Sequence, residues 1–340
     1  MKKFDLNISK APTGWNVTQA VKEILANALE EQAATRTQEI EITCDEKGAW
    51  HIRDYGRGLN YKHLAQSENE EKSSSYDYRG YTPGLGLKEA IGVFDRFGVE
   101  MSIDSKWSHI TFLRTNKYGF DGVSTILALV DKPLDEHFVG TEFILRGVSE
   151  RDITSAKNMF LHYQDIEPLE VTRYGEVYPK TGNYGEIYVN GIKIGQEPYY
   201  LFSYNLTSAS ATIALSLARE RTSAGPNAYR ERVKAILTHC TSEEVISQLT
   251  ANLELFSDGT MSDELEWPGV AAYAAKKLNS RRNVLFLTPR QLQKNIGKVG
   301  ELVWTSGKDI VFISGIVREK IEGQTDDNGD IIATLAHLLR

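Results

Sequence analysis

The sequence is poor in cysteine and in long apolar runs. Its 340 residues include two cysteines, Cys44 and Cys240, which lie far apart and form no metal-ligand pair with nearby histidines. We therefore expect two reduced core thiols rather than a disulfide or a zinc site. The longest strongly apolar stretch, residues 126–130, is far shorter than the roughly 20 residues that span a bilayer. No apolar run follows the two lysines at the start, so we expect a cytoplasmic protein without a secretory signal.

An excess of basic charge is also missing. The chain has 39 lysine and arginine residues against 46 aspartate and glutamate residues, which gives a net charge of −7. Proteins that hold nucleic acid by charge are usually basic, so the net charge does not support a nucleic-acid partner. Basic patches at residues 219–232 and 276–282 leave such a partner open. We expect no membrane partner.

The length predicts two or three domains, and the composition, 41% hydrophobic and 25% charged, is typical of globular proteins. In the first 150 residues, apolar side chains at helical spacing predict helices over residues 17–33 and 85–94. Residues 60–83 are polar and nearly free of aliphatic side chains, so we expect a mobile segment. The segments expected to form strands of one sheet are 39–44, 49–54, 109–114, 123–130 and 140–148.

After about residue 150 the pattern changes. Asn190 and Gly191 separate two runs of alternating apolar residues, which predicts a β-hairpin over residues 186–195. A helix is expected over residues 229–240, and the last part of the chain alternates strands with helices, one of which begins at Thr288–Pro289. We expect three parts, the last packed on the second: residues 1–150, 151–258 and 259–340.

The first expected helix carries three polar residues on the face opposite its apolar stripe. Glu23, Asn27 and Glu30 stand at positions i, i+4 and i+7, which share one face. An amide oxygen is a good neutral ligand for magnesium, and a carboxylate one turn away can orient and deprotonate a water molecule. The alternative is an ordinary solvated polar face.

Asp54 ends an expected strand on the same face as Trp50 and Ile52, so it should point inward, where an unpaired carboxylate is costly. Gly56 and Gly58 follow and allow a close approach to the backbone. A carboxylate in this place can accept a hydrogen bond from the exocyclic amine of adenine. An aspartate before a glycine turn is common in unrelated proteins, so this motif alone is weak evidence.

A glycine-rich segment over residues 80–88 stands at the entrance of the second expected helix. Glycines at a helix start let backbone N–H groups form a nest for an anion, with the helix dipole behind it. Lys88, in the first turn, adds a positive charge. The alternative is a flexible hinge, and neither the Walker A nor the dinucleotide-binding pattern matches. Gly140–Thr141, at the start of a later strand, is uninformative by itself.

Together and in this order, the four elements resemble the GHKL ATPase superfamily (gyrase, heat-shock chaperone, histidine kinase, MutL), with most similarity to MORC-type and phage rIIA-type members. VKEILANALEE resembles the N-box, DYGRG the adenine-binding box, PGLGLK the box at the end of the ATP lid, and GTEFIL the last box. The resemblance covers residues 15–146. It implies an α+β fold with an N-terminal Bergerat α/β sandwich built on a mixed sheet, then a transducer-like α+β region and an α/β C-terminal part.

The resemblance also implies roles for individual residues. Glu23 would be the general base, Asn27 the magnesium ligand, Asp54 the adenine acceptor and Thr141 a water-mediated adenine contact. Residues 60–83 would form the ATP lid. Glu30 stands where the family often has aspartate, which leaves its role open. The positions expected to bind the nucleotide are Asn27, Glu30, Asp54, Gly56, Gly58, Arg79, Gly84, Leu85, Gly86, Leu87, Lys88 and Thr141.

The function implied is an ATP- and Mg²⁺-dependent ATPase whose lid closure and ATP-driven homodimerisation control an unknown protein client. The alternative is a nucleotide-sensing regulatory module with little or no hydrolysis. A basic residue of the second part would reach the γ-phosphate, with Lys193, Arg219 and Arg221 as candidates. Residues 4–8 have few expected local partners, and in relatives such a segment commonly crosses to a second subunit.

Overall fold

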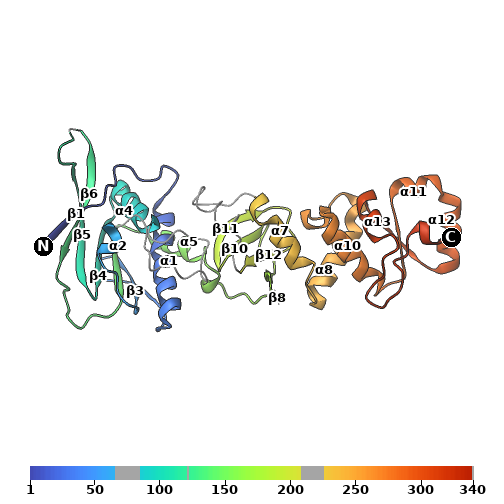
Figure 1. The fold of residues 1–340 in the computed structure, drawn as a ribbon, viewed down its shortest axis with the longest axis horizontal. Helices are drawn as coiled ribbons and strands as arrows, with labels where there is room; N and C mark the ends of the chain where they lie inside the picture. The colour runs from blue at the N-terminus through green and yellow to red at the C-terminus, as the bar shows by residue number, and fades with distance from the viewer. Residues whose placement is uncertain (66–84, 121, 208–225, 339–340) are drawn as a thin grey trace. The chain divides into compact units, whose positions relative to one another are not determined.

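The computed structural model describes residues 1–65, 85–120, 122–207 and 226–338, which form two compact units, Met1–Gln164 and Asp165–Arg340 (Figure 1). The first unit extends past residue 150 because helix α5 (Glu150–Lys157) packs on helix α1 (Val17–Thr35). A hydrogen bond of 2.9 Å from Thr18 Oγ1 to Asp152 Oδ1 joins the two helices. The expected three-part division of the chain stays a prediction.

The first unit is built on a seven-stranded sheet in the order β1-β6-β5-β4-β7-β3-β2. Helices α1 and α4 pack on each other, α1 also contacts β3, and α4 also contacts β4 (Figure 1). The expected α+β sandwich is therefore confirmed. The remaining elements of the unit are β1 (Lys2–Asp5), β2 (Glu41–Cys44), β3 (Ala49–Asp54), α2 (Lys62–Ala65), α4 (Leu85–Phe97), β4 (Glu100–Ser105), β5 (Ser108–Asn116), β6 (Ser124–Asp131), β7 (Thr141–Arg146) and the short 3₁₀ helix η2 (Leu161–Tyr163).

The sheet of the first unit is antiparallel throughout, so the expectation of a mixed sheet is wrong. Strands β3 and β4, which are separated in the chain by helix α4, do run parallel to each other. They are not neighbours, however, because β7 lies between them and pairs antiparallel with both. Because β7 lies between β3 and β4, it prevents the parallel pairing that a helical crossover would otherwise create.

The N-terminal segment also differs from expectation. Strand β1 pairs antiparallel with β6 of the same chain, and Leu6 and Ile8, which follow it, are buried. The prediction that residues 4–8 have few local partners is therefore wrong. Within the strand Phe4 is half-buried, and the strand ends at Asp5, before Asn7 adopts a left-handed conformation (φ 56°).

Helix α1 begins and ends with recognisable local signals. Asn16 and Gln19 form a reciprocal capping box at its start, and Arg36 adopts a left-handed conformation (φ 53°) after its end. The predicted apolar stripe of residues 21, 24, 25 and 28 is fully buried. The helix predicted over residues 17–33 is confirmed.

The second unit contains a five-stranded sheet in the order β11-β10-β12-β9-β8 and a parallel pair, β13 and β14. The predicted hairpin is confirmed, with Asn190 (φ 47°) and Gly191 (φ 80°) in its two-residue turn. The elements of the second unit are β8 (Glu170–Thr172), β9 (Gly175–Tyr178), β10 (Gly185–Val189), β11 (Ile192–Glu197), β12 (Ser203–Leu206), α7 (Pro226–Leu237), α8 (Glu243–Glu254), η3 (Leu255–Asp258), α9 (Asp263–Glu266), α10 (Pro268–Asn279), β13 (Val284–Leu287), α11 (Pro289–Lys294), α12 (Ile296–Ser306), β14 (Asp309–Phe312), α13 (Gly315–Ile321) and α14 (Leu335–Leu338).

One hydrophobic core runs through most of the second unit and includes residues from Val177 to Ile332. It encloses a carboxyl group, that of Glu264, whose Oε1 accepts hydrogen bonds from the Leu201 N–H (2.7 Å) and the Tyr204 hydroxyl (2.8 Å). Its Oε2 has no hydrogen-bond partner among the described residues. Burial raises the pKa of this carboxyl to about 7.

We expect the buried Glu264 to make the protein less stable as the pH rises. The folded carboxyl binds its proton up to a pKa of about 7, whereas the unfolded one releases it near 4.5. The contribution of this group to stability is therefore highest below pH 4.5, falls between 4.5 and 7, and then levels off, with a loss of about 3 kcal/mol. Urea unfolding at several pH values should show a flatter pH dependence for Glu264→Gln than for the wild type.

Glu266→Gln is the matched control, since Glu266 lies in the same helix but is exposed. It should keep the wild-type pH dependence. A Glu264→Gln curve parallel to that of the wild type would contradict the assignment.

Candidate functional site

A row of buried polar side chains crosses the end of the first sheet. Asp54 of β3 lies opposite Thr141 of β7, which lies opposite Ser105 of β4 and then Ser108 of β5. All four side chains are at most 3% exposed. Residues two apart on a strand share a face. The row that lies two positions further into the strands, on the same face as the four polar side chains, is apolar. The inner surface of the sheet thus changes from apolar to polar at the strand ends.

The polar row fastens the turn that follows β3. Asp54 Oδ1 accepts from the Gly56 N–H at 2.9 Å, and Thr141 Oγ1 accepts from the Leu59 N–H at 2.9 Å. Ser105 Oγ donates to the Leu59 carbonyl at 2.9 Å. The ends of β4 and β7 therefore hold the backbone of the DYGRG turn, which leaves it little freedom to move.

The Asp54 carboxyl is electrostatically unusual. Burial raises its pKa to about 6, and the charge of Glu31 pushes in the same direction, while hydrogen bonds from Gly56 and Thr141 oppose the shift. The group is thus mainly ionised at neutral pH, yet it is poised to take up a proton in mildly acidic solution. Such a buried acceptor is suited to a ligand that brings a hydrogen-bond donor.

Gly140, which looked uninformative in the sequence, is required by a close approach of two backbones. Its φ is +83°, and a Cβ atom there would lie 1.9 Å from the Asp54 carbonyl oxygen. Gly58 has a φ of +80°, and its Cβ would lie 2.9 Å from the Gly140 carbonyl oxygen. Both positions therefore need glycine to bring the β7 start against the turn.

Helix α1 supplies the facing wall through Asn27 and Glu31. The Glu31 carboxylate accepts from the backbone N–H, Nε and Nη2 of Arg57, each at 2.9 Å. A Cβ atom on Gly56 would lie 2.4 Å from Glu31 Cγ. Glu31 thus clamps the DYGRG turn to the helix. The sequence reasoning missed it, although it continues the helical face of Glu23 and Asn27 by one more turn.

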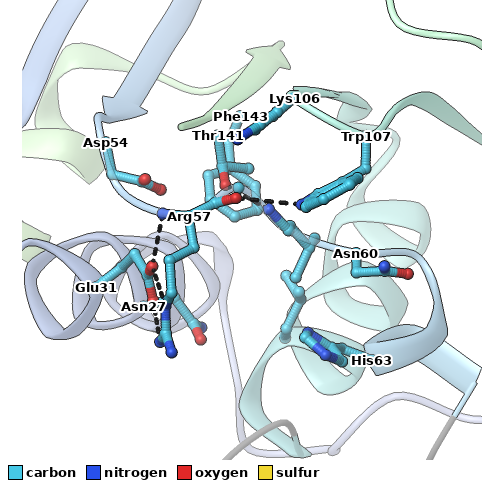
Figure 2. A pocket seen from close by; sticks show the side chains of 13 residues that line it. Asn27, Glu31, Asp54, Arg57, Asn60, His63, Lys106, Trp107, Thr141 and Phe143 are labelled. Carbon is cyan, nitrogen blue, oxygen red and sulfur yellow. Dashed lines mark hydrogen bonds and ion pairs between the residues drawn. The ribbon is translucent and has the colours of Figure 1, made fainter. Parts of the chain in front are cut away.

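These elements enclose a cavity of about 410 Å³ (Figure 2). Five of its lining residues were predicted from the sequence, namely Asn27, Asp54, Gly58, Leu87 and Thr141. The other residues that line the cavity are Glu31, Arg57, Leu59, Asn60, His63, Lys106, Trp107 and Phe143.

Glu23 lies deeper than the cavity wall and is not solvated. It is 2% exposed, and a Cβ atom on Gly86, in the first turn of α4, would lie 2.0 Å from its Oε2. Lys22 Nζ lies 3.6 Å from its Oε1. The structure therefore brings the predicted base and the predicted phosphate-binding segment into contact, and the simple solvated-face alternative does not hold for Glu23.

Asn27 donates from Nδ2 to the Glu23 carbonyl at 2.7 Å. This bond directs the amide nitrogen back to the helix and leaves Oδ1 as the atom that can bind a metal ion. A magnesium ion that keeps phosphate oxygens and water needs few protein ligands, and one amide oxygen fits that role. Within the part of the chain that the structure describes, no three His, Cys, Asp or Glu side chains converge on a metal site.

The remaining predicted positions are less close to the cavity or are not described. Glu30 and Lys88 are half-buried and do not line the cavity, and burial lowers the pKa of the Lys88 ammonium group. Gly56 lies in the turn under Glu31. Three predicted positions lie outside the described residues, namely Arg79, Gly84 and the side chain of Leu85. Most of the expected lid over residues 60–83 is also outside them, and its described part includes α2.

The basic residues of the second unit are partly neutralised. Lys193 forms an ion pair with Glu186, and Arg219 and Arg221 lie outside the described residues. In the basic patch over residues 276–282, each lysine and arginine contacts a carboxylate, and the partners are Asp327, Glu243, Glu254 and Asp309. This patch therefore adds no support for a nucleic-acid partner. None of the helices in the described ranges is both long enough and apolar enough to cross a membrane.

Comparison with known proteins relates the chain to a family and, remotely, to solved structures. Residues 151–243 match the family described as the Mycoplasma pneumoniae MPN635 N-terminal domain. An uncharacterized protein of M. pneumoniae (strain ATCC 29342 / M129 / Subtype 1) is 34% identical over 245 residues, which are 70% of this chain and 97% of the relative. The chain belongs to the family of this Mycoplasma protein.

A second uncharacterized M. pneumoniae protein of the same strain is 31% identical over 164 residues. This alignment covers 47% of the chain and 45% of the relative, so the chain spans less than half of that relative's length. Among solved structures, the chain resembles the 43K ATPase domain of Thermus thermophilus gyrase B in complex with an aminocoumarin. That similarity covers 51% of this chain and 60% of the other, at 15% identity and a TM-score of 0.27, which is too low to establish a shared fold.

Proposed function

We propose that the first unit binds ATP and hydrolyses it in a magnesium-dependent reaction, as the resemblance of its four motifs to GHKL ATPases implies. The observation that carries the proposal is the buried, mainly ionised Asp54 carboxyl on the wall of the 410 Å³ cavity. An ionised carboxylate accepts hydrogen bonds and cannot donate one, so it suits an amine donor, and the resemblance implies that this donor is the exocyclic amine of adenine. The assignment of the α/β sandwich to the Bergerat type is part of the same proposal, since it also follows from the resemblance.

The hydrogen bonds around Thr141 refine its proposed role. Its hydroxyl accepts from the Leu59 N–H, and Thr141, which lies opposite Asp54 on the neighbouring strand, lowers the pKa of that carboxyl. Thr141 would therefore favour the ionised form of Asp54, and its contact to adenine would run through a water molecule. Leu59 and Phe143 supply apolar surface beside these polar groups.

The phosphates would lie toward the first turn of α4, where the backbone N–H groups of a helix start favour an anion. Asn27 Oδ1 would hold magnesium, which neutralises phosphate charge when bound. Glu23, buried against Gly86 at the same helix start, would take the proton from the attacking water. Gly86, Leu87 and Lys88 keep their proposed phosphate role, and Lys88 would meet a phosphate with its positive charge.

Dimerisation on ATP binding and control of a protein client remain part of the proposal. Strand β1 pairs with β6 of its own chain, so an exchange of N-terminal segments between two copies would have to break that pairing first. ATP favours such a dimer only if the dimer binds it more tightly than the monomer does.

Isothermal titration of the whole chain tests the proposed function. We expect ATP to bind with a Kd in the micromolar to millimolar range with magnesium and more weakly with EDTA. Phosphate release should follow ATP addition. Binding without phosphate release would favour the nucleotide-sensing module instead. An absence of binding by ATP and by ADP at millimolar concentration would refute the function itself.

A further inference from the structure

The cavity has a wall that none of the four nucleotide-binding motifs contributes. Lys106 and Trp107 form the short turn between β4 and β5, and both line the cavity. In Figure 2, Trp107 and Asp54 lie on opposite sides of Thr141. The turn therefore lies across the cavity from the proposed acceptor of the adenine amine.

The indole of Trp107 is held in place although it is half exposed. Its Nε1 donates to the Arg57 carbonyl at 3.1 Å, and its backbone N–H donates to Ser105 Oγ at 3.1 Å. The Lys106 N–H donates to the Gly140 carbonyl at 3.1 Å, which ties the same turn to the start of β7. The ring is thus fixed by the DYGRG turn and by the polar row.

A fixed tryptophan that is 51% exposed leaves a large apolar surface in water and loses side-chain freedom. A flat aromatic ligand that covers the ring removes this apolar surface from water, and because the ring is already fixed, binding does not have to order it. The cavity offers such a ligand an acceptor at Asp54 and apolar surface at Leu59 and Phe143. A purine base has the matching features, an amine edge and two flat faces.

We propose that Trp107 is a base-contacting, specificity-determining residue, which packs its indole on the purine of the bound nucleotide. This inference rests on the proposed function and adds a fifth segment, the β4–β5 turn, to the four motifs of the site. Trp107 selects for an extended aromatic base, while Asp54 selects for the amine on that base.

Titration of ATP into Trp107→Ala and Trp107→Phe tests the inference. Loss of one base-stacking side chain should raise the Kd for ATP by about tenfold to a hundredfold in Trp107→Ala. Trp107→Phe keeps a ring but loses the hydrogen bond to Arg57, so it should stay within about threefold of the wild type. Thermal melting of both variants shows whether the fold is kept.

Tryptophan fluorescence gives a second readout that a purely structural role would not change. ATP should quench or shift the emission of the wild type, and Trp107→Phe should lose most of this response. Trp304→Phe, which removes a tryptophan that is 88% exposed in α12, should keep it. If Trp107→Ala fails to fold, the fluorescence of Trp107→Phe decides the question.

An unchanged Kd in Trp107→Ala would overturn the inference while the ATP site still stands. Equal losses in the alanine and phenylalanine variants would also overturn it, because the effect would then come from the Arg57 hydrogen bond. A wild-type protein that binds no ATP would instead refute the proposed function.

Discussion

Replacing Glu23 with alanine is expected to slow ATP hydrolysis by about 10²–10⁴-fold, the usual effect of losing a general base, while ATP still binds. The Glu23 carboxylate is buried against Gly86 at the start of α4, away from the cavity wall that would hold the base. Its loss should therefore change the chemical step more than the affinity. Single-turnover phosphate release and isothermal titration measure the two quantities separately.

Two further variants sharpen this test. Gly86→Ala places a Cβ atom 2.0 Å from Glu23 Oε2, so it should displace the carboxylate and slow hydrolysis although Glu23 is still present. Glu46→Ala, in the exposed β2–β3 turn, removes a carboxylate that is remote from the cavity and should leave the rate unchanged. Hydrolysis by Glu23→Ala at the wild-type rate would show that another group acts as the base.

Replacing Asp54 with asparagine should weaken ATP binding at pH 7.5 by about 10- to 100-fold, since a hydrogen bond to a charged group contributes about 1.5–3 kcal/mol. The wild-type affinity should also fall as the pH drops below about 6, because the raised pKa of Asp54 lets the carboxyl take up a proton there, which removes its charge and makes it a weaker acceptor. Titrations between pH 5 and 8 on both proteins measure this dependence.

The asparagine variant separates the titration of Asp54 from that of the nucleotide phosphates, which is common to both proteins. The ratio of the two Kd values should therefore approach one as the pH falls. Glu142→Gln is a suitable control, because Glu142 is adjacent to Thr141 in β7 but contacts His51 on the other face of the sheet. A pH-independent ratio would mean that Asp54 does not hold the adenine amine.

Local features of this chain were predictable from the sequence because they depend on neighbouring residues. The helical spacing in α1, the period-two alternation that turns Asp54 inward and the Asn190–Gly191 turn all act within a few residues. The helix start at Thr288–Pro289 is another such feature. Each of them agrees with the structure.

Features that depend on strand order were not predictable in this way. The insertion of β7 between β3 and β4 places Thr141 between Asp54 and Ser105, so the Lys106–Trp107 turn comes to the far side of Thr141 from Asp54. No local pattern in β4 indicates this neighbour. The clamp formed by Glu31 was missed for a related reason, since its partner Arg57 lies in another element and the two meet only when α1 packs on β3.

The position of β7 also has a consequence for the synthesis of the chain. Until Thr141–Arg146 has left the ribosome, β3 and β4 cannot be joined, and both present unpaired edges. A nascent or truncated chain that ends before residue 141 therefore has two edges that invite pairing with other chains, and its folding must wait for a contact that is distant in sequence. Asp54 therefore comes opposite Thr141, and the polar row at the cavity is completed, only when β7 pairs with both strands.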